Sequence, residues 1–389
     1  MPEITTSVKK IGIIGCGKRI QSILGNIPSL NKDIVVSSLF DPDKRSIDTT
    51  RQMYNPQAKI CSDYKEITND PEIDWVFIGS WNCFHHEHAI AALQNGKHVF
   101  CEKPLANTLK KCIAIKKAAD EANTIFAIGF TLRYSNHYRK IKELVDEGAI
   151  GKIISMEFNE TLDFDHGGYI HGDWRRLTKY AGSHILEKCC HDIDMVQWIV
   201  GSLPRSVASF AGCDFFVPQN VFYIDKLGMA PNGRLAFDKY PRMNYENPFT
   251  AEKDIADNQV AIFQFYNGVR ASFHTNCCTN LPERRMYICG SEGTLRADVL
   301  KGQIEIAKIS YSDKDNITIK TSTVDGHGGG DYVLGQELYA SIINGVKPAA
   351  GINEGLKSAV ICFAVDEACE TGQVVNMKKY WDIAGVSIY

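Results

Sequence analysis

The feature that most constrains the fold of this chain is a regular alternation of strand and helix patterns over its first 130 residues. Short apolar runs typical of β-strands stand at residues 10–15, 34–40, 75–79, 99–101 and 125–129. Between them lie segments with helical periodicity, and strands that alternate with such helices are typical of parallel βαβ units. Because the runs are almost continuously apolar, the sheet is expected to be covered on both faces. We therefore predict an α/β domain built on a parallel sheet.

The pattern changes after residue 130. Alternating apolar and polar residues flank Asn267-Gly268, a dipeptide typical of a tight hairpin turn. More strand patterns follow, a strong helical pattern covers 184–200, and two helical patterns close the chain. This second part is predicted to be α+β with an open, mostly antiparallel sheet.

The length of the chain, 389 residues, favours two domains, because single cores usually stop growing at about 250–300 residues. We place the N-terminal domain at residues 1–130 and the second at 131–389. Residues 213–253 show little periodicity but many aromatic side chains, which argue against disorder. A connection of this length is predicted to be an inserted lid.

A candidate phosphate loop joins the first strand to the first helix. Gly15 and Gly17 stand where a tight turn brings backbone N–H groups to a pyrophosphate at a helix N-terminus, as in a Rossmann domain. Lys18 and Arg19 follow directly and are grouped with them as cofactor-binding candidates. The usual third glycine is replaced by Ile20. An ordinary strand-to-helix turn is the alternative.

Asp41 ends the second strand, where an acidic side chain accepts hydrogen bonds from the adenosine ribose and repels a 2′-phosphate. This favours NAD over NADP, although Lys44 and Arg45 lie close in sequence. The alternative is a turn aspartate before Pro42.

The helical pattern at 184–200 carries a polar cluster. Glu187 and Lys188 lie four and three residues before His191, so the three side chains can share one helix face. His191 is the candidate general base or acid. A buried core histidine beside a solvated helix edge is the alternative.

Composition excludes several functions. The net charge of −3 gives no reason to expect nucleic acid as a partner. The 13 cysteines are scattered without framework spacing, which is typical of a reduced cytoplasmic protein. The start does not read as a signal peptide, and no apolar stretch is long enough to span a membrane. The clusters His-His-Glu-His (85–88) and Cys-Cys-His (189–191) lack a second half with zinc spacing, so no metal is predicted.

Three segments together carry a family resemblance. They read GIIGCGK from residue 12, FIGSWNCFHHEHAIAALQNGKHVFCEKPLA from residue 77, and GFTLRYSNHYRKIKELVDEGAIGKI from residue 129. The chain resembles the glucose–fructose oxidoreductase / inositol dehydrogenase / rhizopine-catabolism (Gfo/Idh/MocA) family. The resemblance is dense over 10–155, good over 180–200 and diffuse afterwards, and the Glu-Lys-Pro stretch is its most specific part.

The resemblance implies a nicotinamide cofactor and a sugar, polyol or related alcohol as substrate. It places several side chains at the ribose and nicotinamide end of the cofactor, with Trp81 where a proline is usual. They are Ser80, Trp81, Asn82, His85, Glu102 and Lys103. Pro104 is expected to set the turn that presents the last two, through a peptide bond that is cis in many members.

Alcohol oxidation needs a base for the hydroxyl proton and positive charge for the developing alkoxide. Lys103, at the carboxyl end of a strand, is the candidate for the charge or a proton relay, and a solvated loop lysine is the alternative. His191 would exchange the proton. The family's usual aspartate four residues before it is Glu187 here, and Lys188 resembles the lysine of one branch.

Residues 165–176 lie just upstream of this helix. His166, Trp174 and Arg175 are the substrate candidates, because Trp and Arg can stack on and hydrogen-bond a sugar. His327, in a glycine-rich stretch, is a further candidate.

Three functions remain open. The first is an NAD-dependent dehydrogenase acting on a sugar, glycoside or polyol. The second is a glycoside-cleaving enzyme that uses bound NAD transiently, and the third is a non-catalytic NAD-binding sensor. A large apolar sheet face needs cover, so a homodimer or homotetramer is expected.

Overall fold

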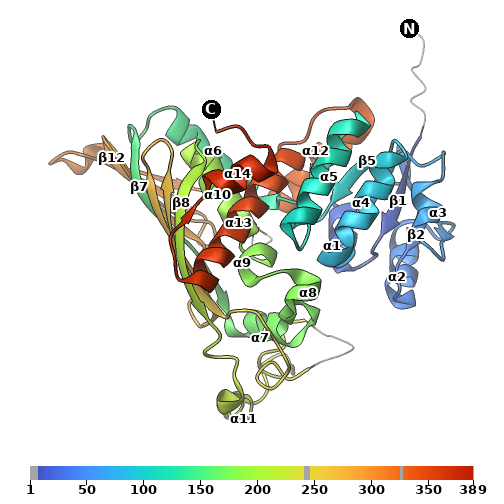
Figure 1. Ribbon diagram of the computed structural model, residues 1–389, viewed down its shortest axis with the longest axis horizontal. Coiled ribbons are helices and arrows are strands. Elements are labelled where there is room, and N and C mark those ends of the chain that lie inside the picture. The colour runs from blue at the N-terminus through green and yellow to red at the C-terminus, as the bar shows by residue number, and fades with distance from the viewer. Residues whose placement is uncertain (1–7, 241–245, 325–326, 389) are drawn as a thin grey trace, which may run out of the picture. The chain divides into compact units, whose positions relative to one another are not determined.

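The computed structural model describes residues 8–240, 246–324 and 327–388 (Figure 1). The chain forms two compact units, and each is taken by itself below. The first comprises Met1–Ser135 and Gly329–Leu356, and the second comprises Asn136–Gly328 and Lys357–Tyr389. The predicted fold class is confirmed, because the first unit holds a parallel sheet and the second a mostly antiparallel one.

The first unit is a Rossmann domain. Its sheet has the order β3-β2-β1-β4-β5-β6, so the strand order reverses between β1 and β4. The strands are β1 (Lys9–Ile14), β2 (Ile34–Phe40), β3 (Lys59–Ile60), β4 (Trp75–Ile78), β5 (His98–Cys101) and β6 (Phe126–Ile128). In sheets of this kind, ligands bind at the carboxyl ends of the strands beside the reversal point. The sequence analysis did not predict β3, because this strand has only two residues, both exposed, and no apolar run indicates it.

Helices connect the strands of this unit, and some of them begin at a capping side chain. They are α1 (Lys18–Gly25), α2 (Lys44–Tyr54), α3 (Lys65–Thr68), α4 (His85–Gln94), α5 (Leu109–Ala122) and, from the later segment, α12 (Gly330–Asn344). The Thr108 side chain accepts the Lys111 N–H at the start of α5, and Asn123 ends that helix with a φ of 52°. Short polar side chains at N-caps satisfy N–H groups that lack a helical partner.

The second unit is built on a nine-stranded sheet. Its order is β14-β13-β12-β11-β7-β10-β9-β8-β15, and only β7 and β10 pair in parallel. The strands are β7 (Ile153–Asp163), β8 (Pro204–Gly212), β9 (Asn258–Phe265), β10 (Arg270–Thr279), β11 (Arg285–Gly290), β12 (Gly293–Asp298), β13 (Gln303–Lys308), β14 (Ile317–Lys320) and β15 (Val375–Asn376). Buried and exposed residues alternate strictly along β9, so one face of the sheet is covered and the other is open.

Several helices belong to this unit, and those at 164–172 and 190–200 contact the sheet at β7. They include α6 (Asn136–Asp146), α7 (Phe164–Gly172), α8 (Thr178–Ala181), α9 (His184–Glu187), α10 (Cys190–Val200) and α14 (Lys378–Ala384), while α13 (Ile352–Thr371) begins in the first unit and continues in the second. The prediction of one continuous helix over 184–200 is wrong. Lys188 and Cys189 separate α9 from α10, and Cys189 has φ −93° and ψ 1°, outside the helical range. Among the described residues, no helix is long and apolar enough to cross a membrane.

The segment that joins β8 to β9 is folded, as its aromatic content indicates. It contains α11 (Tyr223–Leu227) and lies beside α7 (Figure 1). Its buried side chains Phe216, Phe237 and Phe249 share a core with Ile170 of α7. Gly212 and Asn258 are paired in neighbouring strands, so the segment leaves and re-enters the sheet at one place. Residues 241–245 lie outside the described part.

Candidate active site

The glycine loop of the first unit is shaped by a close approach of two backbones. Gly15 has a φ of +90°, and a Cβ built on it would lie 2.3 Å from the Ser80 nitrogen, so only glycine fits. Gly17 is the N-cap of α1, and a Cβ there would meet no atom within 4 Å. The space beside the helix N-terminus is therefore open, which fits a pyrophosphate bound by backbone N–H groups.

Ile20 stands where the third glycine is usual, and the structure shows what replaces it. A Cβ on Gly79, just after β4, would lie 2.1 Å from Cγ1 of Ile20. In the usual motif, a glycine in the helix lets the helix pack closely against the strand. Here Gly79, at the end of the strand, allows this close packing instead. The sequence contains this signal, a glycine directly after the apolar run 75–78, but only the structure pairs it with Ile20.

Asp41 is fixed at the end of β2. Its carboxylate accepts hydrogen bonds from the N–H groups of Cys16 and Asp43, each at 2.7 Å. Burial raises the pKa of this carboxyl, while the two backbone donors oppose the rise. Each carboxylate oxygen keeps a lone pair for a further donor. Asp41 is therefore tied to the glycine loop and suited to accept hydrogen bonds from ribose hydroxyls.

Arg19 joins the glycine loop to the later strands of the same unit. Its guanidinium donates to Glu102 (2.8 Å), Asp331 (2.5 Å) and Thr131 (2.6 Å). Burial disfavours the charged guanidinium, but the charges of Glu102 and Asp331 outweigh it and raise the pKa of Arg19. Of the two predicted cofactor residues, Glu102 is buried and Arg19 is partly exposed. The ion pair holds both at the carboxyl edge of the sheet.

The turn after β5 presents Lys103. The Lys103–Pro104 peptide is cis, as the resemblance implies. The Lys103 N–H donates to Glu102 Oε2 at 3.2 Å, and Nδ1 of His85 lies 2.8 Å from the Pro104 carbonyl oxygen. Nε2 of His85 lies 3.1 Å from the Ser80 carbonyl oxygen. His85 is fully buried, so it joins the two turns rather than lining an open surface.

The other residues predicted around the nicotinamide differ in exposure. Asn82 is buried at the start of a short 3-10 helix, whereas Trp81 just before it is 42% exposed. The Ser80 hydroxyl lies 3.0 Å from Nδ1 of His88. Burial and the neighbouring His85 lower the pKa of His88 to about 3, so His88 is neutral at pH 7.

In the second unit, Lys188 belongs to a buried network of alternating charges. Its Nζ donates to Glu160 Oε1 at 2.7 Å, and Arg284 lies 3.2 Å from the same oxygen. Arg284 also donates two hydrogen bonds to Asp192, at 2.8 and 2.6 Å. The network spans β7, the break between α9 and α10, and the residue before β11.

These contacts determine the charge of Lys188. Burial opposes the ionisation of Glu160, but the attraction of Arg284 and Lys188 overcomes it and holds the pKa of Glu160 well below its usual range. Burial likewise opposes the charge on Lys188, yet Glu160 raises its pKa. Lys188 is therefore a fixed ammonium group at neutral pH and cannot serve as a base.

Glu187 and Arg175, predicted for catalysis and for substrate, contact each other. Nε of Arg175 donates to Glu187 at 3.1 Å, and Nη1 donates to Asp173 (2.9 Å) and the Tyr169 hydroxyl (2.8 Å). The guanidinium carbon lies 4.4 Å from the centroid of the Trp174 ring. These contacts join Trp174, Arg175 and Glu187 into one cluster. Tyr169 belongs to the same cluster, although the sequence did not indicate it.

The two predicted histidines of this unit lie in different surroundings. His191 is buried at the start of α10, and its ring centroid lies 6.0 Å from that of His327. His166 lies on α7, where burial and the charges of Lys188 and Lys239 lower its pKa to about 3. His166 is therefore neutral at pH 7. Its ring lies 6.1 Å from Tyr240, which comes from the β8–β9 segment.

Comparison with known families decides the identity of the fold. Residues 9–130 match a family model described as "Oxidoreductase family, NAD-binding Rossmann fold". Residues 142–377 match its companion, "Oxidoreductase family, C-terminal alpha/beta domain". The chain belongs to the Gfo/Idh/MocA oxidoreductase family. The resemblance inferred from the sequence is confirmed, and with it the NAD-binding class of the first domain.

Individual proteins resemble the chain at identities below 30%. An uncharacterized oxidoreductase of Streptococcus pneumoniae is 28% identical over 203 residues, which are 52% of this chain and 53% of that protein. The 1,5-anhydro-D-fructose reductase of Ensifer adhaerens is 24% identical over 326 residues, 83% of this chain and 86% of that protein. The match thus spans about half the length of the first relative and most of the second.

Solved structures show the same fold. A levoglucosan dehydrogenase in complex with NADH and levoglucosan superposes with a TM-score of 0.77 at 21% identity. The match covers 96% of this chain and 100% of that one. The Gfo/Idh/MocA fold therefore extends over nearly the whole chain.

Several residues of the site escaped the sequence analysis. They are the charged residues Glu160, Arg284 and Asp331. Charged residues make up 23% of the chain, and the sequence around these three does not indicate that their side chains are buried. Their partners lie far away along the chain, as Arg19 and Asp331 show at a separation of 312 residues. Glu160 lies inside the long strand β7, and the apolar residues of that strand were the one sign in the sequence that it is buried.

Proposed function

We propose that this oxidoreductase transfers a hydride between NAD and a secondary hydroxyl of a neutral sugar, glycoside or polyol. The turn that presents Lys103 carries the proposal. Buried Glu102 and His85 hold this lysine at the carboxyl edge of the sheet that also bears the glycine loop and Asp41. A lysine held in this position can stabilise the negative charge that develops on a reacting oxygen.

Bound NAD supplies the hydride acceptor, and the chain supplies the remaining groups. Gly15, Gly17 and Asp41 bind and orient the dinucleotide, with the pyrophosphate at the N-terminus of α1. Lys103 stabilises the alkoxide that develops on the substrate oxygen. His191 exchanges the hydroxyl proton. Lys188 has a fixed charge, so its role is to position substrate oxygens by hydrogen bonds.

The charges of the second unit favour a neutral substrate. Three cations near the predicted catalytic helices have carboxylate partners. The pairs are Arg175 with Asp173 and Glu187, Lys188 with Glu160, and Arg284 with Glu160 and Asp192. No positive charge in this set is left over to bind a carboxylate or phosphate group. The exposed side of the Trp174–Arg175 pair is suited to stacking on a sugar ring.

The decisive experiment has two steps. Mass spectrometry of the purified full chain should identify NAD as the bound dinucleotide. Neutral sugars, polyols and glycosides are then compared with uronic acids and sugar phosphates, with NADH formation as the readout. We expect turnover with neutral compounds only. Turnover with anionic compounds alone would contradict the charge argument, and none at all with NAD bound would favour a sensor.

A second function is supported by one observation. His166 is a neutral imidazole beside the ammonium of Lys188, in addition to His191. A route that oxidises, eliminates, hydrates and reduces a glycoside needs more proton-transfer groups than a simple dehydrogenation. Release of the aglycone without accumulation of NADH would identify this route.

The choice of NAD over NADP gives a testable prediction. The cations near Asp41 are engaged elsewhere, because Lys44 pairs with Asp48 (2.5 Å) and Arg45 with Asp43 (3.2 Å). Replacing Asp41 with Ser removes the negative charge that repels a 2′-phosphate. It also removes the carboxylate that accepts hydrogen bonds from the ribose hydroxyls. We expect the ratio of NAD to NADP affinity to fall by about tenfold or more, since each lost charged hydrogen bond costs about 1.5–3 kcal/mol. Fluorescence titration with NADH and NADPH measures this ratio, and Glu121→Ser, which removes an exposed carboxylate from α5, serves as control.

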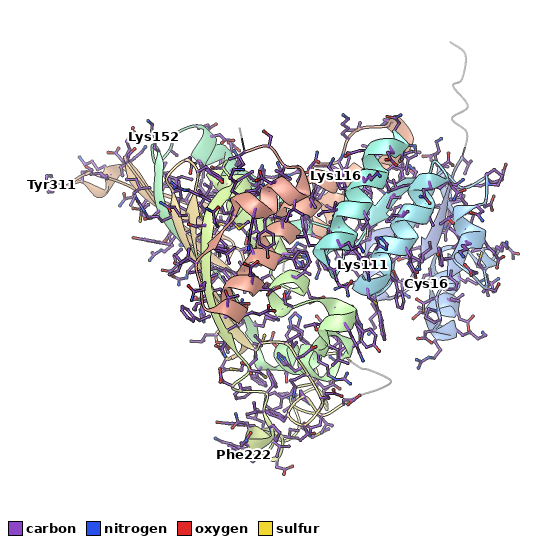
Figure 2. The ribbon with its side chains drawn as sticks, viewed as in Figure 1. Cys16, Lys111, Lys116, Lys152, Phe222 and Tyr311 are labelled. Atoms are coloured by element: carbon purple, nitrogen blue, oxygen red, sulfur yellow. The ribbon has the colours of Figure 1, made fainter. Side chains whose placement is uncertain are left out.

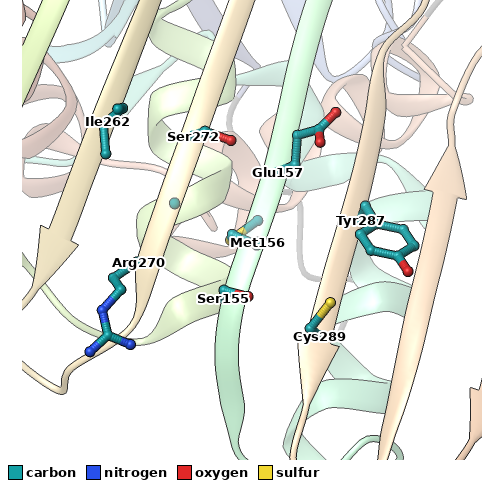
Figure 3. Close-up of a pocket in the computed structure, with 9 residues that line it drawn as sticks. Ser155, Met156, Glu157, Ile262, Arg270, Ser272, Tyr287 and Cys289 are labelled. Atoms are coloured by element: carbon teal, nitrogen blue, oxygen red, sulfur yellow. The ribbon is translucent and has the colours of Figure 1, made fainter.

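We further propose that the open face of the second sheet forms a homo-oligomer interface. Phe210, Val260 and Ile262 are 68%, 46% and 61% exposed on adjacent strands. A hollow on the sheet, lined by Met156, Ile262, Arg270, Tyr287 and their neighbours, lies on strands β7, β9, β10 and β11 (Figure 3). Exposed apolar side chains that gather on one face of a sheet are typical of an interaction surface.

Replacing Ile262 with Glu should therefore disrupt the oligomer, because it places a charge in the apolar interface without disturbing the core. Sedimentation velocity of the full chain should show the native protein as a dimer or tetramer and the variant as a smaller species. Exchange of exposed Lys152, on the turn before β7 (Figure 2), for Glu serves as control. A native protein that sediments as a monomer would contradict the proposal.

A further inference from the structure

A cluster of metal-ligating side chains lies in the second unit, and none of its members is assigned to catalysis above. A ring nitrogen of His171, Sγ of Cys213 and a carboxylate oxygen of Asp257 all lie within 4.8 Å of one another. His171 is in the last turn of α7, Cys213 follows β8, and Asp257 precedes β9. The cluster thus stands where the β8–β9 segment leaves and re-enters the sheet.

His171 is prepared to donate a lone pair. The ring is fully buried, and Nδ1 lies 3.0 Å from the Gly167 carbonyl oxygen. A carbonyl only accepts, so Nδ1 carries the hydrogen, and Nε2 has the lone pair. Nε2 is buried and has no hydrogen-bond partner among the residues that the structure describes. A histidine whose other N–H donates to a carbonyl is typical of metal ligands.

The distances between the ligand atoms suit a small cation. Sγ of Cys213 lies 3.7 Å from Oδ2 of Asp257. In a tetrahedral zinc site with Zn–S and Zn–O bonds of about 2.3 and 2.0 Å, these two atoms would be about 3.5 Å apart. This pair is therefore close to the spacing of a zinc site, and the ring nitrogen of His171, which lies within 4.8 Å of Sγ and of a carboxylate oxygen, would move inward to close the site around an ion.

Oδ1 of Asp257, bonded to the same carbon as the Oδ2 that faces Cys213, can release a lone pair at little cost, so the carboxylate would bind an ion through Oδ1 or through both oxygens. The Asp214 N–H is shared between its two oxygens, at 3.1 Å from each, and it can stay on one of them. The other donor to Oδ1, the Asn258 side chain, also lies 2.8 Å from Asp214 Oδ2. The Phe215 and Phe216 N–H groups keep the carboxylate in place through Oδ2.

We propose that His171, Cys213 and Asp257 bind a divalent cation of the zinc class. Imidazole, thiolate and carboxylate together select zinc or cobalt over magnesium and calcium, which prefer oxygen ligands alone. Binding converts the Cys213 thiol to a thiolate and releases its proton to the solvent, and water fills the fourth position. The ion would join both ends of the β8–β9 segment to α7, the helix that carries His166 and Tyr169.

Cobalt(II) tests the proposal with the full chain, because thiolate-bound cobalt has a charge-transfer absorption in the near ultraviolet. We expect this absorption to saturate at one ion per chain and to be abolished by Cys213→Ser. The control is Cys369→Ser, which removes a comparable half-buried thiol from α13 and should leave the absorption unchanged. No saturable absorption in the native protein, or its retention in Cys213→Ser, would overturn the proposal.

A second measurement on the native chain decides the case if Cys213→Ser does not fold, as judged by circular dichroism. Alkylation followed by peptide mass spectrometry reports the reactivity of each thiol. Zinc should slow alkylation of Cys213 at least tenfold and leave the alkylation rate of Cys369 unchanged. Equal rates at Cys213 with and without zinc would contradict a metal bound there.

Discussion

Replacing Lys103 with Ala should lower kcat by about 10²–10⁴-fold, the range lost when a group that stabilises or transfers charge at the reacting atoms is removed. The dissociation constant for NADH should change only a few-fold, because Gly15, Gly17 and Asp41 bind the distant part of the dinucleotide and stay intact. Steady-state kinetics with a substrate from the panel, and fluorescence titration with NADH, measure the two quantities.

Lys110→Ala is the matched control for this substitution. Lys110 is an exposed lysine on α5 of the same unit, so its loss should leave both quantities unchanged. Lys103→Arg keeps the charge on a bulkier group and should recover part of the rate. Near-native turnover in Lys103→Ala would refute the role proposed for this lysine. Equal loss of turnover and of NADH binding would instead assign Lys103 to the cofactor alone.

Replacing Arg284 with Met should destabilise the second unit by about 3–5 kcal/mol, because it leaves Asp192 and Glu160 buried with fewer partners. Denaturant unfolding followed by circular dichroism measures the change. Arg285→Met is the control, since Arg285 pairs with the exposed Glu157 and its loss should cost less than about 1 kcal/mol.

The direction of the pH dependence separates a charge effect from lost packing. Burial raises the pKa of the Asp192 carboxyl to about 7 in the native chain, and Arg284 opposes this rise, so the Arg284→Met variant should raise the pKa further above its unfolded value. The penalty is therefore present at high pH and shrinks as the pH falls and the carboxyl takes up a proton. Asp192→Asn added to Arg284→Met should restore part of the stability at pH 8. A penalty that is equal at pH 5.5 and pH 8 would indicate lost packing instead.

The alternation of apolar runs and helices predicted the parallel sheet correctly, because a buried strand leaves an apolar run in the sequence. Periodicity failed where the backbone departs from regular geometry. The spacing of Glu187 and His191 predicted that they share one helix face. In the structure, the break at Lys188 and Cys189 places them in two helices. The broken turn lets Lys188 reach Glu160, a contact formed across 28 residues that no local rule reveals.

The roles of single charged residues were predictable only in part. The motif around Glu102 and Lys103 marked a site, since a charged pair after a buried strand is unusual. It gave no sign that Arg19 would neutralise Glu102. Burial of a charge depends on partners that the fold brings from distant segments, so Arg284 and Asp331 became visible only in the structure.

The pairing of Gly212 with Asn258 has a consequence for how such proteins diversify. Two antiparallel strands that end side by side need only a short turn between them, so the register of the sheet does not depend on the length of what joins them. Insertions and deletions in this connection would change the side chains that surround the substrate candidate His166, Tyr240 among them, while the sheet below stays as it is. Swapping the connection between relatives would therefore test whether it sets substrate preference.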